Sequence, residues 1–165
     1  MSKPTKYYSD IQENMIADYL NWHTVVGSGA TATKPGDIQS DQWLGECKTH
    51  TKKMDKIVFR FDHWVKIRKE AQSKFKYPVL FTDNGTQKAE CTFCLIDLDV
   101  CSLVGAIFIS TDDKPSVSSI TLNKSVLSHL MTMPFSVLEV KFQNTDLAGG
   151  NLGVISLDNF RRYII

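Results

Sequence analysis

Apolar residues along this chain change their spacing repeatedly, from a helical period to the two-residue period of a strand and back. A capping box formed by Ser9 and Gln12 predicts a first helix over about residues 10–22. Its apolar face consists of Ile11, Ile16, Tyr19 and Leu20. Helical spacing returns over residues 57–75, with Ile57, Phe61, Trp64, Val65, Ala71 and Phe75 on the apolar side. The shorter apolar segments read as strands, so the sequence predicts an α/β fold with a helix first and a mixed sheet.

Several short strands are expected outside these helices. Residues 37–39 and 43–48 form a hairpin joined through Ser40 and Asp41. Period-two alternation then places Leu44, Glu46 and Lys48 on one face of the second strand. The other expected strands cover residues 23–26, 78–82, 91–98, 100–110, 137–142 and 152–157. Asn84-Gly85 is expected as a hairpin turn, 112–115 as a loop, 122–133 as a helix and 158–165 as a tail.

The composition is that of one globular domain. The 165 residues have a mass of 18.6 kDa and are 42% hydrophobic and 22% charged, enough to form a core without disulfides or a structural metal. No apolar run reaches the ~18 residues of a membrane span, and the first ten residues lack the apolar stretch of a signal peptide. We therefore expect a cytoplasmic protein without a membrane partner.

The cysteines are expected to be free thiols, because such a protein meets a reducing compartment. They are Cys47, Cys91, Cys94 and Cys101. A zinc site at Cys91-x-x-Cys94 is disfavoured, since residues three apart in a strand face opposite sides.

Positive charge is concentrated in one segment, although the formal net charge is only +1. Residues 48–76 contain ten Lys or Arg and three Asp or Glu, and ten minus three gives a local balance of +7. Such a segment is typical of a surface that binds a polyanion such as nucleic acid.

The spacing with the clearest chemical meaning is Gly36-Asp37, followed after eight residues by Glu46-Cys47-Lys48. Carboxylates on neighbouring strands of a hairpin can converge on one point, where paired oxygen ligands suit Mg²⁺ or Mn²⁺. Lys48, two residues after Glu46, emerges on the same face. A divalent cation with a nearby ammonium group is the equipment for phosphodiester hydrolysis. The alternative is a surface ladder of salt bridges along the hairpin.

Two other acid-x-Lys triplets show that the triplet alone is weak evidence. Glu139-Val140-Lys141 also lies in an expected strand, but its nearest upstream carboxylate is Asp113, far along the chain. Asp112-Asp113-Lys114 lies beside a proline in an expected loop. Glu46 alone has a Gly-Asp partner at hairpin distance.

These residues resemble the PD-(D/E)xK nuclease superfamily, in particular archaeal-type Holliday junction resolvases and their phage-encoded relatives. The resemblance extends over about residues 9–98 and includes Trp64-Val65-Lys66-Ile67, Glu70-Ala71 and Tyr77-Pro78-Val79-Leu80. It implies a restriction-endonuclease-like core of helix, strand meander, helix and strand around a mixed sheet. Residues from about 110 to 165 would form a C-terminal α/β extension of the same domain. The sequence departs from the motif at Gly36, which separates Pro35 from Asp37.

The resemblance also implies roles for individual residues. Asp37, Glu46 and the main-chain carbonyl of Cys47 would hold Mg²⁺, or Mn²⁺ in its place. Lys48 would orient or deprotonate the attacking water and stabilise the phosphate. Glu13 would hold the metal or its water from the opposite side, and Ser28 would act in catalysis or contact the backbone. Without the resemblance, Glu13 reads equally well as a solvent-facing helix residue and Ser28 as a loop-former.

The expected activity is that of a magnesium-dependent endodeoxyribonuclease in DNA recombination and repair, most simply a homodimeric resolvase that nicks four-way junctions. If phage-encoded, it would act in the host cytoplasm. The expected phosphate contacts are Lys34, Lys52, Lys53 and Lys56. Two alternatives remain: a restriction-like, repair or nicking enzyme for linear or damaged DNA, and a DNA-binding module on the same scaffold that does not cleave.

Overall fold

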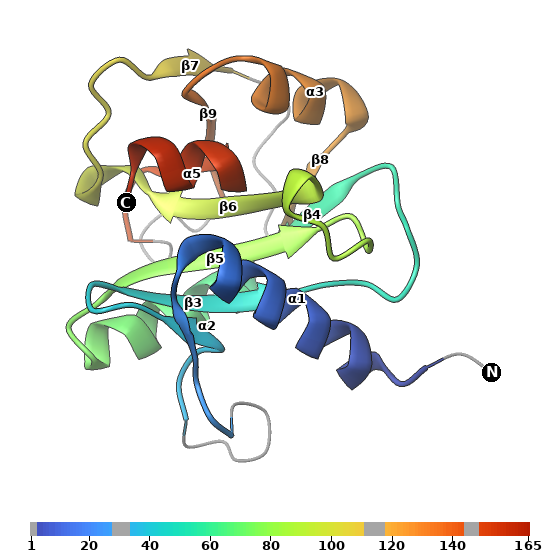
Figure 1. Cartoon of the computed structure of the whole chain (residues 1–165). Helices are drawn as coiled ribbons and strands as arrows, with labels where there is room; N and C mark the ends of the chain where they lie inside the picture. Colours follow the sequence, from blue (N-terminus) through green and yellow to red (C-terminus); the bar gives the residue numbers. More distant parts are fainter. Residues whose placement is uncertain (1–2, 28–33, 111–117, 144–148) are drawn as a thin grey trace.

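The computed structural model describes residues 3–27, 34–110, 118–143 and 149–165. Within them a central sheet of eight strands has the order β1-β2-β3-β5-β6-β10-β9-β7 (Figure 1). Its strands are β1 (His23–Thr24), β2 (Ile38–Gln39), β3 (Trp43–Lys48), β5 (Tyr77–Asp83), β6 (Thr92–Asp97), β7 (Ile107–Ile109), β9 (Ser136–Val140) and β10 (Leu152–Ser156). The helices are α1 (Thr5–Leu20), α2 (Phe61–Ser73), α3 (Lys124–Thr132) and α5 (Leu157–Tyr163). A separate ribbon pairs β4 (Ile57–Arg60) with β8 (Ser119–Leu122).

The sheet is mixed, as predicted. β3 and β5 run parallel and are connected through α2, whereas β2–β3, β5–β6, β6–β10 and β9–β10 are antiparallel. The predicted hairpin is present, with Ile38 opposite Gly45 and Gln39 opposite Leu44. The fold is therefore α/β, and strands from residues 136–156 complete the sheet that the earlier strands begin.

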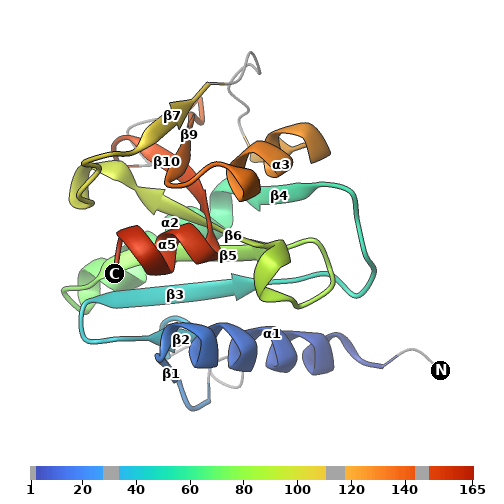
Figure 2. The same ribbon diagram turned by 45° about the horizontal axis from the view of Figure 1, so that its top comes forward.

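Helices cover both faces of the sheet. On one face α1 and α5 pack through Ile16, Leu20 and Phe160, which are buried. On the other face α2, α3 and the β4–β8 ribbon bury Trp64, Leu130 and other apolar residues. Figure 2 shows α1 running beside β3, which is how the first helix reaches the end of that strand.

The first helix begins earlier than predicted. It starts at Thr5 after Pro4, so Ser9 lies inside it and its hydroxyl donates to the Thr5 carbonyl. The predicted capping box is therefore wrong, since an N-cap must have non-helical backbone. The helix ends at Leu20 with Asn21 in the left-handed region (φ 57°). Trp22 lies outside the helix but is buried.

The second helix is shorter than predicted, because residues 57–60 form a strand. Ile57 and Phe59 are buried and Val58 is half-buried, the alternation of a strand with one covered face. Their partner β8 is about sixty positions away in the sequence, so local spacing could not distinguish this strand from a first helical turn. The helix itself begins at Phe61.

Other boundaries also differ from prediction. Of residues 100–110, only Ile107–Ile109 form a strand, and the third helix begins at Lys124 because Asn123 caps it. Asn84-Gly85 lies in the connection between β5 and β6, which also contains the short helix Ala89–Cys91. The predicted tail contains α5, with Phe160 buried. The loop expected at 112–115 lies outside the described residues.

Two further findings bear on the environment of the chain. Cys47, Cys91, Cys94 and Cys101 are free thiols. In the part of the chain that the structure describes, no helix combines the length and the apolar character that crossing a membrane requires.

Candidate active site

The residues singled out around Asp37 and Glu46 line one groove of about 930 Å³ at the edge of the sheet. The groove is bounded by α1, by the chain that enters β2, by the end of β3 and by α2. Its lining includes Glu13, Asp37, Glu46, Cys47 and Lys48. Segments that are distant in sequence thus meet beside the hairpin of β2 and β3.

Asp37 lies directly before β2, at the point beyond which the end of β3 has no partner on this side among the described strands, although β5 pairs along its other side. Its backbone N–H donates to the Gly45 carbonyl (2.8 Å), and its side-chain Oδ2 accepts from the Cys47 N–H (2.8 Å). In an extended strand the N–H and C=O of one residue point to the same side. The Cys47 carbonyl therefore faces the same open edge as Asp37.

Glu46 is a buried carboxylate, only 3% exposed, that forms ion pairs with the ammonium groups of two lysines. Lys48 Nζ lies 2.7 Å from its Oε1, and Lys66 Nζ lies 3.2 Å from each of its oxygens. A buried charge requires such pairing, since an unpaired one would be strongly destabilising. Glu46 and Lys48 share a face of β3, as the alternation predicted, and α2 supplies the second cation.

The first helix is fixed against the end of β3 by a buried amide. Gln12 is fully buried, and its Nε2 donates to the Lys48 carbonyl (2.7 Å). Its buried Oε1 has no hydrogen-bond partner among the described residues. The adjacent residue, Glu13, lines the groove together with Asp37 and Glu46.

The carboxylates are crowded enough to perturb one another. Burial, followed by the negative charges of Asp37 and Asp10, raises the pKa of Glu13 to about 7. Burial and the Glu46 charge raise the pKa of Asp37 to about 6, although the Cys47 N–H acts in the opposite direction. Burial is the larger cause of both shifts, and repulsion between the carboxylates adds to it. A cation bound between these carboxylates would relieve that repulsion.

Two residues on α2 that the resemblance includes without giving them a role, Lys66 and Glu70, also contact the groove residues. Glu70 accepts from the backbone N–H of Gly36 (Oε2, 2.9 Å), and its other oxygen lies 3.5 Å from Lys66 Nζ. Glu70 therefore positions the residue before Asp37. Lys66 has a raised pKa: partial burial alone would lower it, but Glu46 and Glu70 outweigh that effect. Their i,i+4 spacing was visible in the sequence, but their position over β3 depends on the β3–α2–β5 packing.

The donor set fits a hard divalent cation in part. Asp37, Glu46 and the Cys47 carbonyl offer oxygen ligands, the type that Mg²⁺ prefers. Across the described residues, however, no group of three or more His, Cys, Asp or Glu side chains is placed to hold a metal ion. Two carboxylates and one carbonyl suit Mg²⁺, which keeps several waters, and Glu13 would then act on a water rather than as a direct ligand.

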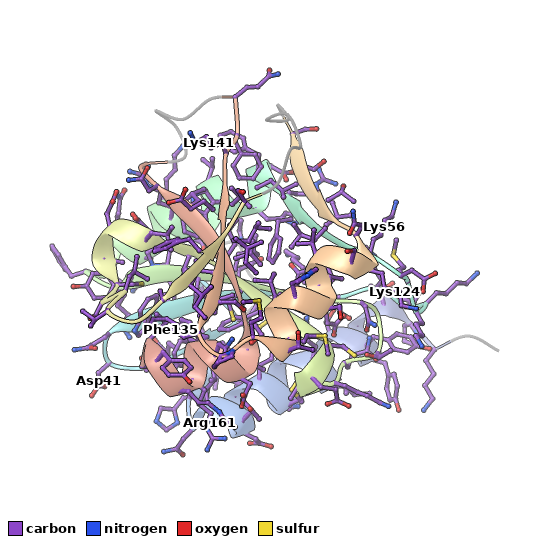
Figure 3. All side chains as sticks on the ribbon, turned by 90° about the horizontal axis from the view of Figure 1, so that it is seen from above. Asp41, Lys56, Lys124, Phe135, Lys141 and Arg161 are labelled. Carbon is purple, nitrogen blue, oxygen red and sulfur yellow. The ribbon has the colours of Figure 1, made fainter. Side chains whose placement is uncertain are left out.

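The lysines expected to contact phosphate lie in two places. Lys34 lines the groove and donates to the Val26 carbonyl (2.6 Å). Lys52, Lys53 and Lys56 are exposed in the connection between β3 and β4, beyond Lys48. Lys56 projects from the surface on the same side as Lys124 (Figure 3), in agreement with the pairing of Ile57 with Leu122.

The remaining candidates are not brought into the groove. Ser28 lies outside the described residues, as does the triplet 112–114. Glu139 is in β9, exposed and far from α1 and β3 in the strand order, so its acid-x-Lys triplet has no Gly-Asp partner. Of the two acid-x-Lys triplets within the described residues, the one at Glu46 therefore lines the groove and the one at Glu139 does not.

Comparisons with known proteins give no family for this chain. No protein-family model, curated protein or solved structure matches it.

Proposed function

We propose that the protein is a magnesium-dependent endonuclease with a PD-(D/E)xK type of site that nicks branched DNA, with four-way junctions as its main substrate. The observation that carries this proposal is the convergence of Asp37, Glu46, the Cys47 carbonyl and Lys48 on one open groove. A ladder of surface salt bridges would not bury Glu46 or raise the pKa of Asp37.

The order of elements supports the same proposal. Helix α1 is followed by the strands β1, β2 and β3, then by α2, and then by β5 parallel to β3. This order is compatible with the helix, meander, helix and strand of the restriction-endonuclease-like core that we propose. The ribbon strand β4 is an addition to that pattern, and β6, β9 and β10 extend the sheet beyond β5.

Hydrolysis of a phosphodiester needs a deprotonated water and compensation of the charge on the phosphate. It also needs a proton for the leaving oxygen, which a second water from solvent would supply. Asp37, Glu46 and the Cys47 carbonyl would hold a divalent cation, which when bound would neutralise phosphate charge and acidify a nearby water. Lys48 is held by Glu46 with its ammonium at the groove, where it would stabilise developing negative charge. Glu13, with a pKa of about 7, is suited to take a proton from water near neutral pH.

DNA as the substrate is supported by the charge distribution. The local excess of +7 over residues 48–76 begins in the groove at Lys48 and continues through the β3–β4 connection and α2. Such lysines bind phosphates irrespective of base sequence, which suits an enzyme that recognises branched shape.

The test uses labelled DNA of one sequence, presented as a four-way junction, as linear duplex and as single strands. Purified protein is incubated with each in Mg²⁺ or in EDTA. The inactive variant is Glu46→Gln, and its matched control is Glu139→Gln, the same acid-x-Lys triplet on an exposed strand outside the groove.

Paired nicks in the junction that require Mg²⁺ and Glu46 but not Glu139 are the expected result. Equal or preferential cutting of linear duplex would assign the site to a general nuclease. Tight binding to DNA with no cutting of any substrate would overturn catalysis and leave a binding module.

A further inference from the structure

Phe75, in the connection between α2 and β5, has a conformation and an exposure that its own packing does not explain. Its side chain is 98% exposed, and its φ is +56°, in the left-handed region. The preceding helix ends in a Schellman arrangement, in which the Lys76 N–H donates to the Ala71 carbonyl (2.9 Å). The left-handed residue of this motif is usually glycine, because a Cβ there costs free energy.

A second phenylalanine shows how such a cost is ordinarily compensated. Phe135 also has a positive φ (+47°), but it is 5% exposed and stacks on Tyr163 with ring centroids 4.5 Å apart. Phe75 has no comparable burial. A residue that is strained and adds nothing to the core marks a position at which something other than folding stability is served.

The surroundings of Phe75 indicate the chemistry of its partner. Lys74 is exposed beside it, and Lys69 and Lys66 follow along the outer side of α2 to the groove, where Lys66 lies against Glu46. With a rise of about 1.5 Å per residue, Lys66 lies about 10 Å along α2 from the end of the helix at Ser73, and Phe75 follows two residues later. A row of cations that ends in an exposed aromatic ring matches a polyanion with exposed π-faces.

We propose that Phe75 stacks on an unpaired base of DNA whose backbone follows the lysines of α2 away from the groove. This deepens the proposed function and rests on it for the identity of the polyanion. The surface would distinguish DNA with unstacked bases, as at a branch, from continuous duplex.

The test measures binding in EDTA, where cleavage plays no part. The probes are a forked DNA with unpaired thymines and a fully paired duplex with the same number of phosphates, and affinity is followed by fluorescence anisotropy. The variants are Phe75→Gly, Phe75→Trp and the control Phe108→Ala, which removes a half-exposed phenylalanine on β7, away from α2.

Phe75→Gly is expected to weaken binding to the fork about tenfold, as for the loss of one stacked base, and to leave duplex binding unchanged. Phe75→Trp keeps the preference for the fork, and Phe108→Ala behaves as wild type. The melting temperature of Phe75→Gly should equal or exceed that of wild type, because glycine suits the left-handed position. Misfolding is thereby excluded as the cause of weaker binding.

Unchanged fork binding by Phe75→Gly, or an equal loss on fork and duplex, would overturn the inference. Loss of a dimer in Phe75→Gly, seen by sedimentation, would also overturn it and assign the ring to a second copy of the chain. These outcomes can be told apart from those of the nuclease test. If the protein binds the fork through Phe75 but cleaves no DNA, only the proposed catalysis is refuted. If the protein cleaves DNA and Phe75→Gly changes neither cleavage nor fork binding, only the proposed stacking is refuted.

Discussion

Replacing Asp37 by Asn should make the metal-free protein more stable at neutral pH while removing its activity. The pKa of Asp37 is raised by burial and by Glu46, from 3.8 to about 6. An acid with a raised pKa in the folded state binds more protons when folded than when unfolded between those two values. The stability that the Asp37 carboxyl contributes is therefore fully present below pH about 4, and this contribution is lost as the pH rises through about 6.

The size of this loss follows from the shift. About two pKa units at ~1.4 kcal/mol each give a ceiling of about 3 kcal/mol, and partial solvent screening reduces the expected figure to about 1–2 kcal/mol. Asn cannot ionise, but its side-chain oxygen can still accept from the Cys47 N–H as Asp37 does. Asp37→Asn should therefore recover most of this free energy at pH 8 without losing the hydrogen bond.

Urea unfolding in EDTA, followed by circular dichroism at pH 4 and pH 8, measures the effect. The free energy of unfolding of wild type should decrease from pH 4 to pH 8, and that of Asp37→Asn should decrease less. Part of this pH dependence remains in Asp37→Asn because the pKa of Glu13 is also raised, to about 7. Asp41→Asn, an exposed aspartate on the same hairpin, is the control. At pH 8, saturating Mg²⁺ should stabilise wild type, by about 2.7 kcal/mol at a hundred times its Kd, but not Asp37→Asn. If Asp37→Asn were less stable than wild type at pH 8 and kept the full slope, the reasoning would be refuted.

Further changes separate chemistry, binding and folding. Lys48→Met should slow junction cleavage at least a hundredfold in single-turnover assays and alter affinity little, because its ammonium is held at Glu46. The Lys52→Ala/Lys53→Ala pair should reduce the slope of log affinity against log salt by about 1.8, if each lysine contacts one phosphate. Phe59→Ala should cost about 3–5 kcal/mol in urea unfolding, because Phe59 is fully buried in β4.

Sequence patterns predicted the β2–β3 hairpin better than they predicted the boundaries of the helices. The hairpin was predictable because turn residues and alternation are local signals, and it brings Asp37 and Glu46 to one groove. The strand β4 was not, because its identity depends on pairing with β8. Glu70 was missed for the same kind of reason: its contact with Gly36 joins residues 34 positions apart. Local periodicity carries no information about which surface of a helix meets which strand.

The geometry of the groove depends on β2 being short. β2 pairs only Ile38 and Gln39 with β3, so the N–H of Cys47 would lack a partner if the Asp37 side chain did not accept from it. The Asp37 carboxylate thus accepts the hydrogen bond that a further residue of β2 would accept, and it also lines the groove as a charged group. A longer β2 would satisfy the Cys47 N–H by backbone pairing and close the edge that the Cys47 carbonyl faces. Asp37→Ala should therefore lose both the hydrogen bond to Cys47 and the charge in the groove, whereas Asp37→Asn should lose the charge alone. The difference between the two variants in metal-free stability therefore measures the contribution of the hydrogen bond.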